Sequence, residues 1–176
     1  MSEVDAILAF LAVAAAINFA IIAHLWRHGR ARTGAPRDLL FPAGARIAEI
    51  SGENRDGADV RIAAGDTAYV LVFLSKGCPK CRAVAGEVAS AAGRSADRGV
   101  ELWIVATDGL TAADVGMDPA LDAHVLELRG LAYAMLNPRR ASPAYLFVAS
   151  DLVVQAGGFV GDEDWRAFAA QLAEPR

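Results

Sequence analysis

The chain has few of the side chains that most often carry chemistry in proteins. Its 176 residues include two cysteines, two lysines and three histidines. A structural zinc site needs four ligands, and no second cysteine pair is present to complete one. The net charge is −4 at pH 7, and no basic patch is combined with aromatic residues. The composition therefore argues against a zinc site and gives no support to nucleic-acid binding.

Both cysteines and both lysines fall within one heptapeptide, residues 75–81, which reads Ser-Lys-Gly-Cys-Pro-Lys-Cys. It follows an apolar run, 69–74, that is typical of a buried strand, and it precedes a stretch of helix formers, 82–92. A Cys-x-x-Cys at a strand-to-helix junction is typical of a thioredoxin-like redox site. Half of a metal site and inert packing are the alternatives for two cysteines at this spacing.

Each member of the motif has an expected part. Cys78 would lie beside the unpaired N–H groups of the helix start, where the positive end of the dipole stabilises a thiolate. Cys81, one turn deeper, could close a disulfide with it. Pro79 suits the first turn because its missing N–H costs nothing there, and Lys76 and Lys80 add positive charge. The redox interpretation needs no cofactor besides a Cys78–Cys81 disulfide, and we predict no metal.

A long apolar run near the start of the chain predicts a membrane anchor. Residues 6–26 carry no charged side chain, and at 1.5 Å per residue such a run spans roughly 30 Å, the thickness of a bilayer core. A cleaved signal peptide would begin with basic residues and have a shorter core, whereas this chain begins with acidic ones. We predict three parts: an anchor over 1–27, a linker over 28–45 and a folded domain over 46–176.

The charges around this run bear on its orientation. Four arginines follow it and none precedes it, namely Arg27, Arg30, Arg32 and Arg37. Because positive residues stay on the cytoplasmic side, this pattern alone would leave the domain in the cytoplasm.

The pattern of the remaining chain predicts an α/β domain with a central mixed sheet flanked by helices. The expected elements are an N-terminal hairpin around 47–62 with a turn at 51–57, strands at 69–74, 100–106, 124–128, 142–148 and 152–159, and helices at 83–98, 119–122, 131–136 and 164–172. A strand, helix and strand followed by a hairpin and helix is the thioredoxin arrangement. Pro143 opens a central strand, and we predict a cis Ser142–Pro143 bond facing the disulfide, with the Ser142 backbone free to pair with an extended substrate segment.

Three segments together resemble membrane-anchored thioredoxin-like proteins of the TlpA and MauD type: residues 70–81, the strand that opens at Ser142–Pro143, and residues 157–165. The resemblance implies that Cys78 is the attacking thiol, Cys81 the resolving thiol and Pro143 the substrate-side proline. One position departs from the thioredoxin pattern, which has a buried acid six residues before the first cysteine. Val72 stands there, so deprotonation of Cys81 would lack its usual helper.

The same resemblance implies a role and a location. MauD-like proteins assist the maturation of methylamine dehydrogenase, so the expected partner is a protein disulfide or dithiol, with a membrane electron donor as a further candidate. The resemblance places the domain on the periplasmic side of the inner membrane, against the arginine pattern, and we expect the periplasmic side.

Two other functions remain open from the residues alone. Ser75 and Cys78 loosely match a peroxiredoxin motif, although Leu71 stands where that motif has proline; this alternative is a thiol peroxidase. The second is a copper-binding module that uses Cys78, Cys81 and His124, because soft thiolates suit Cu(I).

Overall fold

The computed structural model describes residues 40–174, so the predicted anchor and most of the predicted linker lie outside the described residues. Within residues 40–174 no helix has the length and apolar character needed to cross a membrane. The described strands form one sheet in the order β2-β1-β5-β4-β3-β6-β7. They are β1 (Ile50–Asn54), β2 (Asp59–Ile62), β3 (Ala68–Phe73), β4 (Val100–Ala106), β5 (Val125–Glu127), β6 (Ala144–Val148) and β7 (Val154–Phe159).

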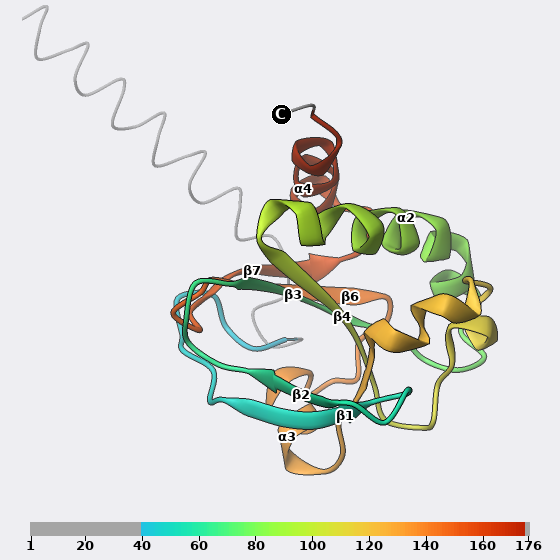
Figure 1. Ribbon diagram of the computed structural model, residues 1–176, viewed down its shortest axis with the longest axis horizontal. Coiled ribbons are helices and arrows are strands. Elements are labelled where there is room, and N and C mark those ends of the chain that lie inside the picture. Colours follow the sequence, from blue (N-terminus) through green and yellow to red (C-terminus); the bar gives the residue numbers. More distant parts are fainter. Residues whose placement is uncertain (1–39, 175–176) are drawn as a thin grey trace, which may run out of the picture. The chain divides into compact units, whose positions relative to one another are not determined.

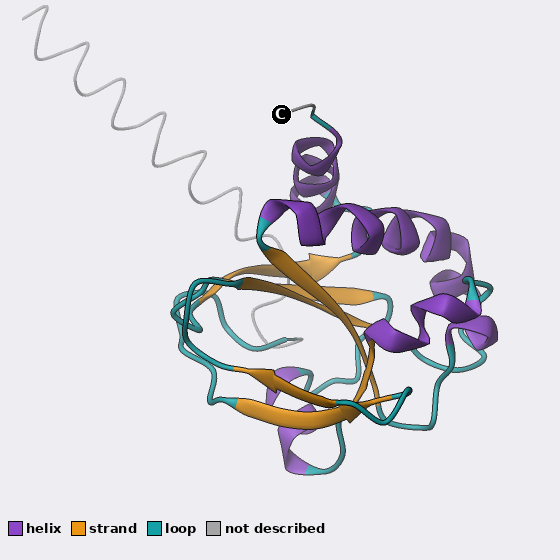
Figure 2. Ribbon diagram, in the orientation of Figure 1, coloured by secondary structure: helices purple, strands orange, loops and turns teal. Residues whose placement is uncertain are grey.

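Helices cover both faces of this sheet. They are α2 (Pro79–Ser95), α3 (Leu131–Leu136), α4 (Glu163–Ala173) and the short 3₁₀ helices η1 (Ala96–Arg98), η2 (Ala112–Val115) and η3 (Pro119–His124). Figure 1 shows α2 and α4 on one side of the central strands and α3 on the other, and Figure 2 shows the strands enclosed between helices. The structure therefore confirms the predicted mixed sheet flanked by helices.

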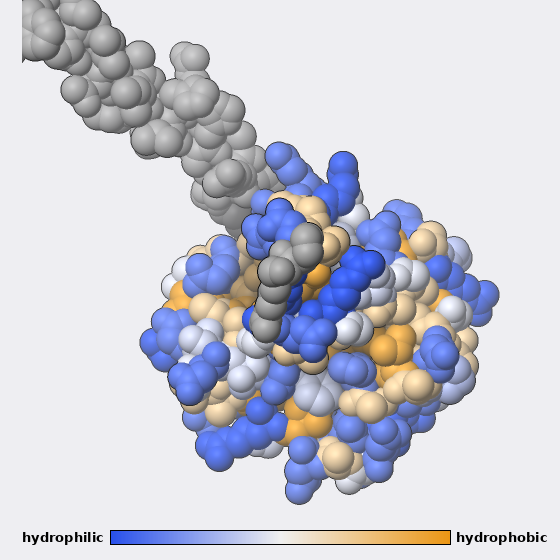
Figure 3. Space-filling view, turned by 45° about the horizontal axis from the view of Figure 1, so that its top comes forward, coloured by the Kyte–Doolittle hydropathy of each residue, from blue (hydrophilic) through white to orange (hydrophobic). Residues whose placement is uncertain are grey.

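Two apolar cores hold these layers together. One lies between the sheet and helices α2 and α4, where Trp165 is fully buried and its ring contacts those of Tyr145 and Phe168. The other lies on the opposite face, where the ring of Tyr133 from α3 meets that of Phe73 edge-on at 5.7 Å between centroids. On the domain face seen in Figure 3, hydrophilic residues surround scattered hydrophobic patches.

Strand β3 is the centre of the sheet and sets the place of the site. It is apolar throughout and buried except at its first residue, as expected for a strand covered on both faces. It runs parallel to β4, with Phe73 opposite Val105, and antiparallel to β6, with Phe73 opposite Ala144. The end of β3, the end of β4 and the start of β6 therefore meet at one edge of the sheet.

The turn of the N-terminal hairpin is shorter, and its first strand longer, than the sequence pattern predicts. Residues 51–54, which we expected in a turn, belong to β1, and Gly52 pairs with Val60 of β2. Glycine fits here because an added Cβ would come within 2.7 Å of a methyl group of Leu126 in the core. The turn-like composition of this strand thus reflects a close approach of two chain segments.

Part of the predicted linker packs on the domain. Leu40 and Phe41 contact the core on the α3 side of the sheet. The backbone N–H of Phe41 donates to the Leu136 carbonyl at 3.0 Å, and that of Gly44 donates to the Val154 carbonyl at 2.8 Å. The apolar side chains at 40 and 41 explain why the packed region reaches back beyond residue 46.

Candidate active site

The two cysteines lie where β3 passes into α2. The loop turns at Gly77, whose φ of +71° is the left-handed conformation that favours glycine. Cys78 is the N-cap of α2, and its sulfur accepts a hydrogen bond from the backbone N–H of Cys81 at 3.1 Å. Both are thiols in this structure; Cys78 is half-buried and Cys81 is fully buried. One sulfur is thus accessible at a helix start, and the other lies just beneath it.

The surroundings of Cys78 favour its thiolate. Partial burial by itself raises the pKa of Cys78, but hydrogen bonds from the side chain and the backbone N–H of Cys81 stabilise the charged sulfur. The Ser142 side chain and the Lys80 backbone add further hydrogen bonds, and the pKa of Cys78 falls below its ordinary value. Donors clustered at a helix N-terminus are a known cause of acidic cysteines.

Cys81 is shifted in the opposite direction. Burial, the hydrogen bond to Cys78 and the charge of Cys78 together raise the pKa of Cys81 to about 11, against smaller opposing effects of Ser75 and Ser142. The two thiols therefore divide the roles that thiol–disulfide exchange requires: one is ionised readily and exposed, the other keeps its proton and is covered.

The Ser142–Pro143 segment lies beside the cysteines, and its peptide bond is cis, as predicted. The hydroxyl of Ser75 donates to that of Ser142 at 2.8 Å, which ties the segment to the cysteine loop. The Ser142 side chain also helps to lower the pKa of Cys78 as a hydrogen-bonding group near its sulfur. Sequence analysis assigned Ser142 a backbone role, and the structure adds a role for its hydroxyl and for Ser75.

The lysines are placed differently from what we expected. The ammonium group of Lys76 pairs with the Asp114 carboxylate at 3.2 Å, and lysine charges are not among the causes of the low pKa of Cys78. Lys80 acts on Cys78 through its backbone instead. Asp114 itself belongs to a capping box with Thr111 at η2, a Thr-x-x-Asp pattern that was readable in the sequence but that we missed.

Val72, which stands where thioredoxin has a buried acid, lies in an apolar environment. It is fully buried in β3, between Ile104 of β4 and Tyr145 of β6. The groups that shift the pKa of Cys81 are Cys78, Ser75 and Ser142, besides burial. No carboxylate is therefore at hand for Cys81 within the described residues.

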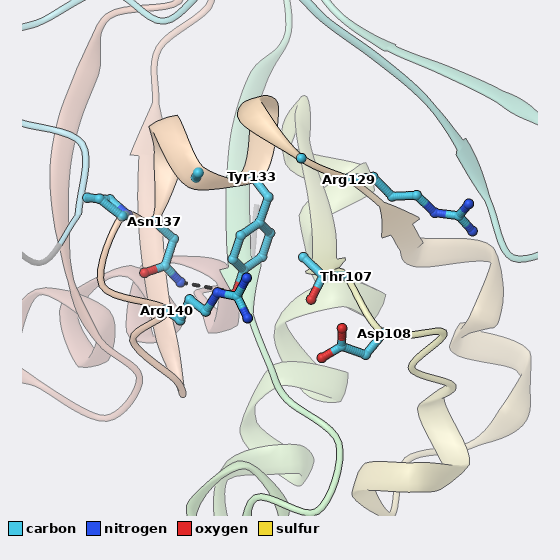
Figure 4. Close-up of a pocket in the computed structure, with 9 residues that line it drawn as sticks. Thr107, Asp108, Arg129, Tyr133, Asn137 and Arg140 are labelled. Carbon is cyan, nitrogen blue, oxygen red and sulfur yellow. Dashed lines mark hydrogen bonds between the residues drawn. The ribbon is translucent and has the colours of Figure 1, made fainter.

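A polar pocket opens at the same edge of the sheet, on the α3 side. Figure 4 shows Arg140, Thr107 and Asp108 converging in front of Tyr133, whereas Arg129 extends away from them. These residues could not be singled out from the sequence, because they come from α3 and from separate loops that only the fold brings together.

The described residues include no group of three or more His, Cys, Asp or Glu side chains placed to hold a metal ion. His124, the third ligand considered for copper, contacts the Leu102 carbonyl through Nδ1 at 3.1 Å and lies against the Trp103 ring. Residues 40–174 therefore provide no third ligand for the copper-binding alternative.

Comparison with known proteins gives the fold a name. No protein-family model and no curated protein matches the chain. Among solved structures, peroxidoxin BcpB of Mycobacterium tuberculosis is similar with a TM-score of 0.58 and 17% identity, over 77% of this chain and 99% of that one. A thiol:disulfide interchange protein from Bacteroides sp. gives a TM-score of 0.56 and 16% identity, over 77% and 93% of the two chains.

A secreted disulfide oxidoreductase of Mycobacterium tuberculosis is also similar, with a TM-score of 0.52 and 19% identity, over 70% of this chain and 94% of that one. At such identities the likeness speaks for the fold. Together with the strand order and the helices on both faces, it shows that the described domain has a thioredoxin-like fold.

Proposed function

We propose that the protein is a thiol–disulfide oxidoreductase acting on protein substrates. The observation that carries this proposal is the opposite shift of two thiols within one helical turn: Cys78 is half-exposed with a lowered pKa, and Cys81 is buried with a raised one. The names of several similar structures, which describe disulfide oxidoreductases and interchange proteins, support the same activity.

In the proposed reaction the Cys78 thiolate attacks one sulfur of a substrate disulfide. A mixed disulfide forms and the other substrate sulfur leaves as a thiolate. Cys81 then loses its proton and attacks the Cys78 sulfur, which closes the Cys78–Cys81 disulfide and releases the second substrate thiol. The protein supplies two electrons, and the reverse sequence oxidises a substrate dithiol.

The Ser142–Pro143 segment is the proposed docking site for the substrate chain. It lies beside Cys78 and is fixed there by the Ser75–Ser142 hydrogen bond. An extended substrate segment could pair with the Ser142 backbone by strand addition, which would bring its disulfide to the exposed sulfur.

Hydrogen bonds that favour the Cys78 thiolate also favour the reduced protein, because the thiolate exists only in that state. A more stable reduced form makes the pair a stronger oxidant. We therefore place this protein toward the oxidising end of its class.

Two serine variants test the activity. Cys78→Ser should abolish exchange with a disulfide protein such as insulin, because no accessible thiolate remains. Cys81→Ser should stop after the first step and accumulate a mixed disulfide, which non-reducing electrophoresis and mass spectrometry detect. The double variant is the matched control for non-specific effects. Exchange that persists in the double variant would rule out the proposal.

We further propose that the protein is a membrane-tethered member of the TlpA and MauD type, with its domain in the periplasm and a methylamine dehydrogenase or a cytochrome-type protein as a client. The apolar run over 6–26 and the motif resemblance support this proposal, and the arginines after the run oppose the orientation. Reporter fusions after Gly34 test it: a reporter active only in the cytoplasm would overturn the periplasmic assignment.

A second candidate function is a thiol peroxidase. The similarity to a peroxidoxin favours it, as does the Ser75-x-x-Cys78 spacing. Peroxide consumption by the reduced protein separates the two functions. We expect slow consumption compared with disulfide exchange, because the hydroxyl of Ser75 is bonded to Ser142 and not directed at an incoming peroxide.

A further inference from the structure

The pocket beside the cysteines has features of a binding site for a small charged group. It has a volume of about 150 Å³ and is lined by polar side chains from the loop after β4, from α3 and from the loop after α3. This is room for a head group of a few non-hydrogen atoms. The exposed thiol and the pocket lie at the same edge of the sheet, because β3 and β4 are parallel neighbours that both end there.

Two opposite charges face this pocket without pairing. Arg140 and Asp108 converge in Figure 4, but within residues 40–174 the side chain of neither has an ion-pair or hydrogen-bond partner. Arg129, by contrast, forms an ion pair with Glu127 at 2.6 Å and extends away from the pocket in Figure 4. An unpaired cation and an unpaired anion on one small pocket suit a ligand that carries both charges.

The wall that carries Arg140 is held rigidly. Asn137 is fully buried, accepts from the Ala141 N–H at 2.7 Å and donates to the Ala141 carbonyl at 2.8 Å. Asn137 also donates to the Tyr133 hydroxyl at 3.3 Å, the bond drawn in Figure 4. The phenol proton is therefore left to donate into the pocket, and burial raises the pKa of Tyr133 so that the proton is retained.

The pocket also lies within reach of the reacting sulfur. Arg140 precedes Ser142 by two residues, so their Cα atoms are at most about 7.6 Å apart, and the Ser142 side chain is close enough to Cys78 to help lower the pKa of its thiol. Cys81 is also close enough to Tyr133 to make a small contribution to the raised pKa of the phenol. A ligand held here by its head group would therefore lie on the part of the domain that carries Cys78, and the proposal requires its sulfur to reach that thiol.

We propose that this pocket binds the zwitterionic amino acid head group of a low-molecular-weight disulfide, of which cystine is the simplest. Arg140 and the Tyr133 hydroxyl bind the carboxylate, and Asp108 binds the ammonium group. The inference rests on the proposed thiol–disulfide exchange and adds a small-molecule substrate class to it.

The reaction is balanced by the two protein thiols. Cys78 attacks one sulfur of cystine and expels one cysteine as its thiolate. Cys81 gives up its proton to the expelled cysteine thiolate, directly or through water, and attacks the Cys78 sulfur, so that the second cysteine leaves as a thiolate and the protein disulfide forms. Two electrons pass from the protein to cystine, and two cysteine molecules result.

Four disulfides dissect the recognition: cystine carries both charges, cystamine only the ammonium group, 3,3′-dithiodipropionate only the carboxylate, and 2-hydroxyethyl disulfide neither. The oxidation rate of the reduced full-length protein is measured with each by quenching and alkylation. Dividing each variant's rate by that of the unaltered protein removes the intrinsic reactivity of each disulfide.

Charge removal should act selectively. Arg140→Gln should slow the reaction with cystine and dithiodipropionate by about tenfold, as expected for one charge-assisted contact that is partly exposed, and leave the other two unchanged. Asp108→Asn should slow only the reactions with cystine and cystamine. Arg139→Gln and Asp66→Asn make the same charge changes at exposed side chains that do not line the pocket, and should change no ratio.

The outcomes separate the two proposals. If Arg140→Gln and Asp108→Asn slow all four disulfides equally, or none of them, the zwitterion pocket is wrong and the exchange activity stands. If none of the four disulfides, nor a protein disulfide, oxidises the unaltered protein, both proposals are wrong.

Discussion

At the scale of single residues, the site depends on hydrogen bonds to sulfur. Cys78 receives them from the Cys81 side chain and backbone, from the Ser142 side chain and from the Lys80 backbone, and together they outweigh the effect of burial on its pKa. The lysines, which the sequence places next to the cysteines, contribute less than their position suggests, because the Lys76 ammonium group is paired with Asp114. Position along the chain showed where the charges are, but only the fold shows which groups they meet.

The first prediction concerns pH. Because alkylation requires the thiolate, the rate at Cys78 should rise with pH through a pKa below the ordinary thiol value and then level off, whereas Cys81 should react only as pH approaches about 11. Iodoacetamide labelling of the reduced protein, quantified by mass spectrometry for each cysteine, measures both profiles. In the Cys78→Ser variant, the Cys81 profile should move to lower pH, because the charge on Cys78 is absent.

Equal reactivity of the two cysteines across the pH range would contradict this assignment of their roles.

The second prediction concerns Ser142. Ser142→Ala removes a hydrogen bond to the Cys78 thiolate, so the alkylation profile of Cys78 should shift to higher pH. It also removes the bond to Ser75. Ser90→Ala, on the exposed side of α2, is the matched control and should leave the profile in place. An unchanged profile in Ser142→Ala would show that its hydroxyl does not act on the sulfur.

At the scale of elements, caps and close approaches decide where helices and strands begin and end. Asp162 caps α4 by accepting from the Trp165 N–H at 2.9 Å, and its carboxylate also accepts from the Tyr145 hydroxyl at 2.9 Å. Gly158 of β7 lies directly against this carboxylate. One acid thus joins a strand, a helix and a core tyrosine.

The third prediction uses two glycines that differ in their surroundings. Gly158→Ala should lower the free energy of unfolding by about 2 kcal/mol, because the added Cβ would collide with the capping carboxylate and break its bonds. Gly86 lies in α2, where an added Cβ would have no neighbouring atom within 4 Å. Gly86→Ala should therefore raise the free energy of unfolding by about 0.5–1 kcal/mol. Urea unfolding of the reduced proteins compares them, and the idea fails if Gly158→Ala is as stable as the unaltered protein.

Most elements could be predicted because their apolar patterns are long. The runs at 69–74 and 100–106 and the spacing in 164–172 gave strands and a helix close to their observed bounds. The errors have physical causes: β1 was missed in part because Gly52 reads as a turn residue, and η2 was missed because a helix of four residues is too short to show an apolar period. The cysteine pair and the cis proline were also readable. The pocket around Tyr133 was not, since it needs contacts between distant loops.

At the scale of the whole molecule, the first residues of the described domain pack against its core. Leu40 and Phe41 cover the core beneath α3, and Phe41 is bonded to the end of that helix. The segment that leads away from the domain therefore contributes to its stability.

The fourth prediction compares two shortened chains. A chain that begins at Asp38 should unfold like the full domain, whereas one that begins at Arg46 should lose about 2 kcal/mol, the effect of exposing two half-buried apolar side chains. Thermal unfolding followed by circular dichroism measures the difference. The Phe41→Ala variant of the chain that begins at Asp38 should have an intermediate stability. Equal midpoints for the two chains would show that residues 38–45 add nothing.

The high pKa of Cys81 has a consequence for timing. Part of it comes from the neighbouring negative sulfur of Cys78, and that charge disappears as soon as Cys78 is joined to a client. Capture of the client would thus itself make the second thiol more acidic, so that the departing client thiolate or water could take its proton without a dedicated carboxylate. In the reduced protein without a client, Cys81 keeps its proton. A carboxylate at the position of Val72 is then not needed to activate it.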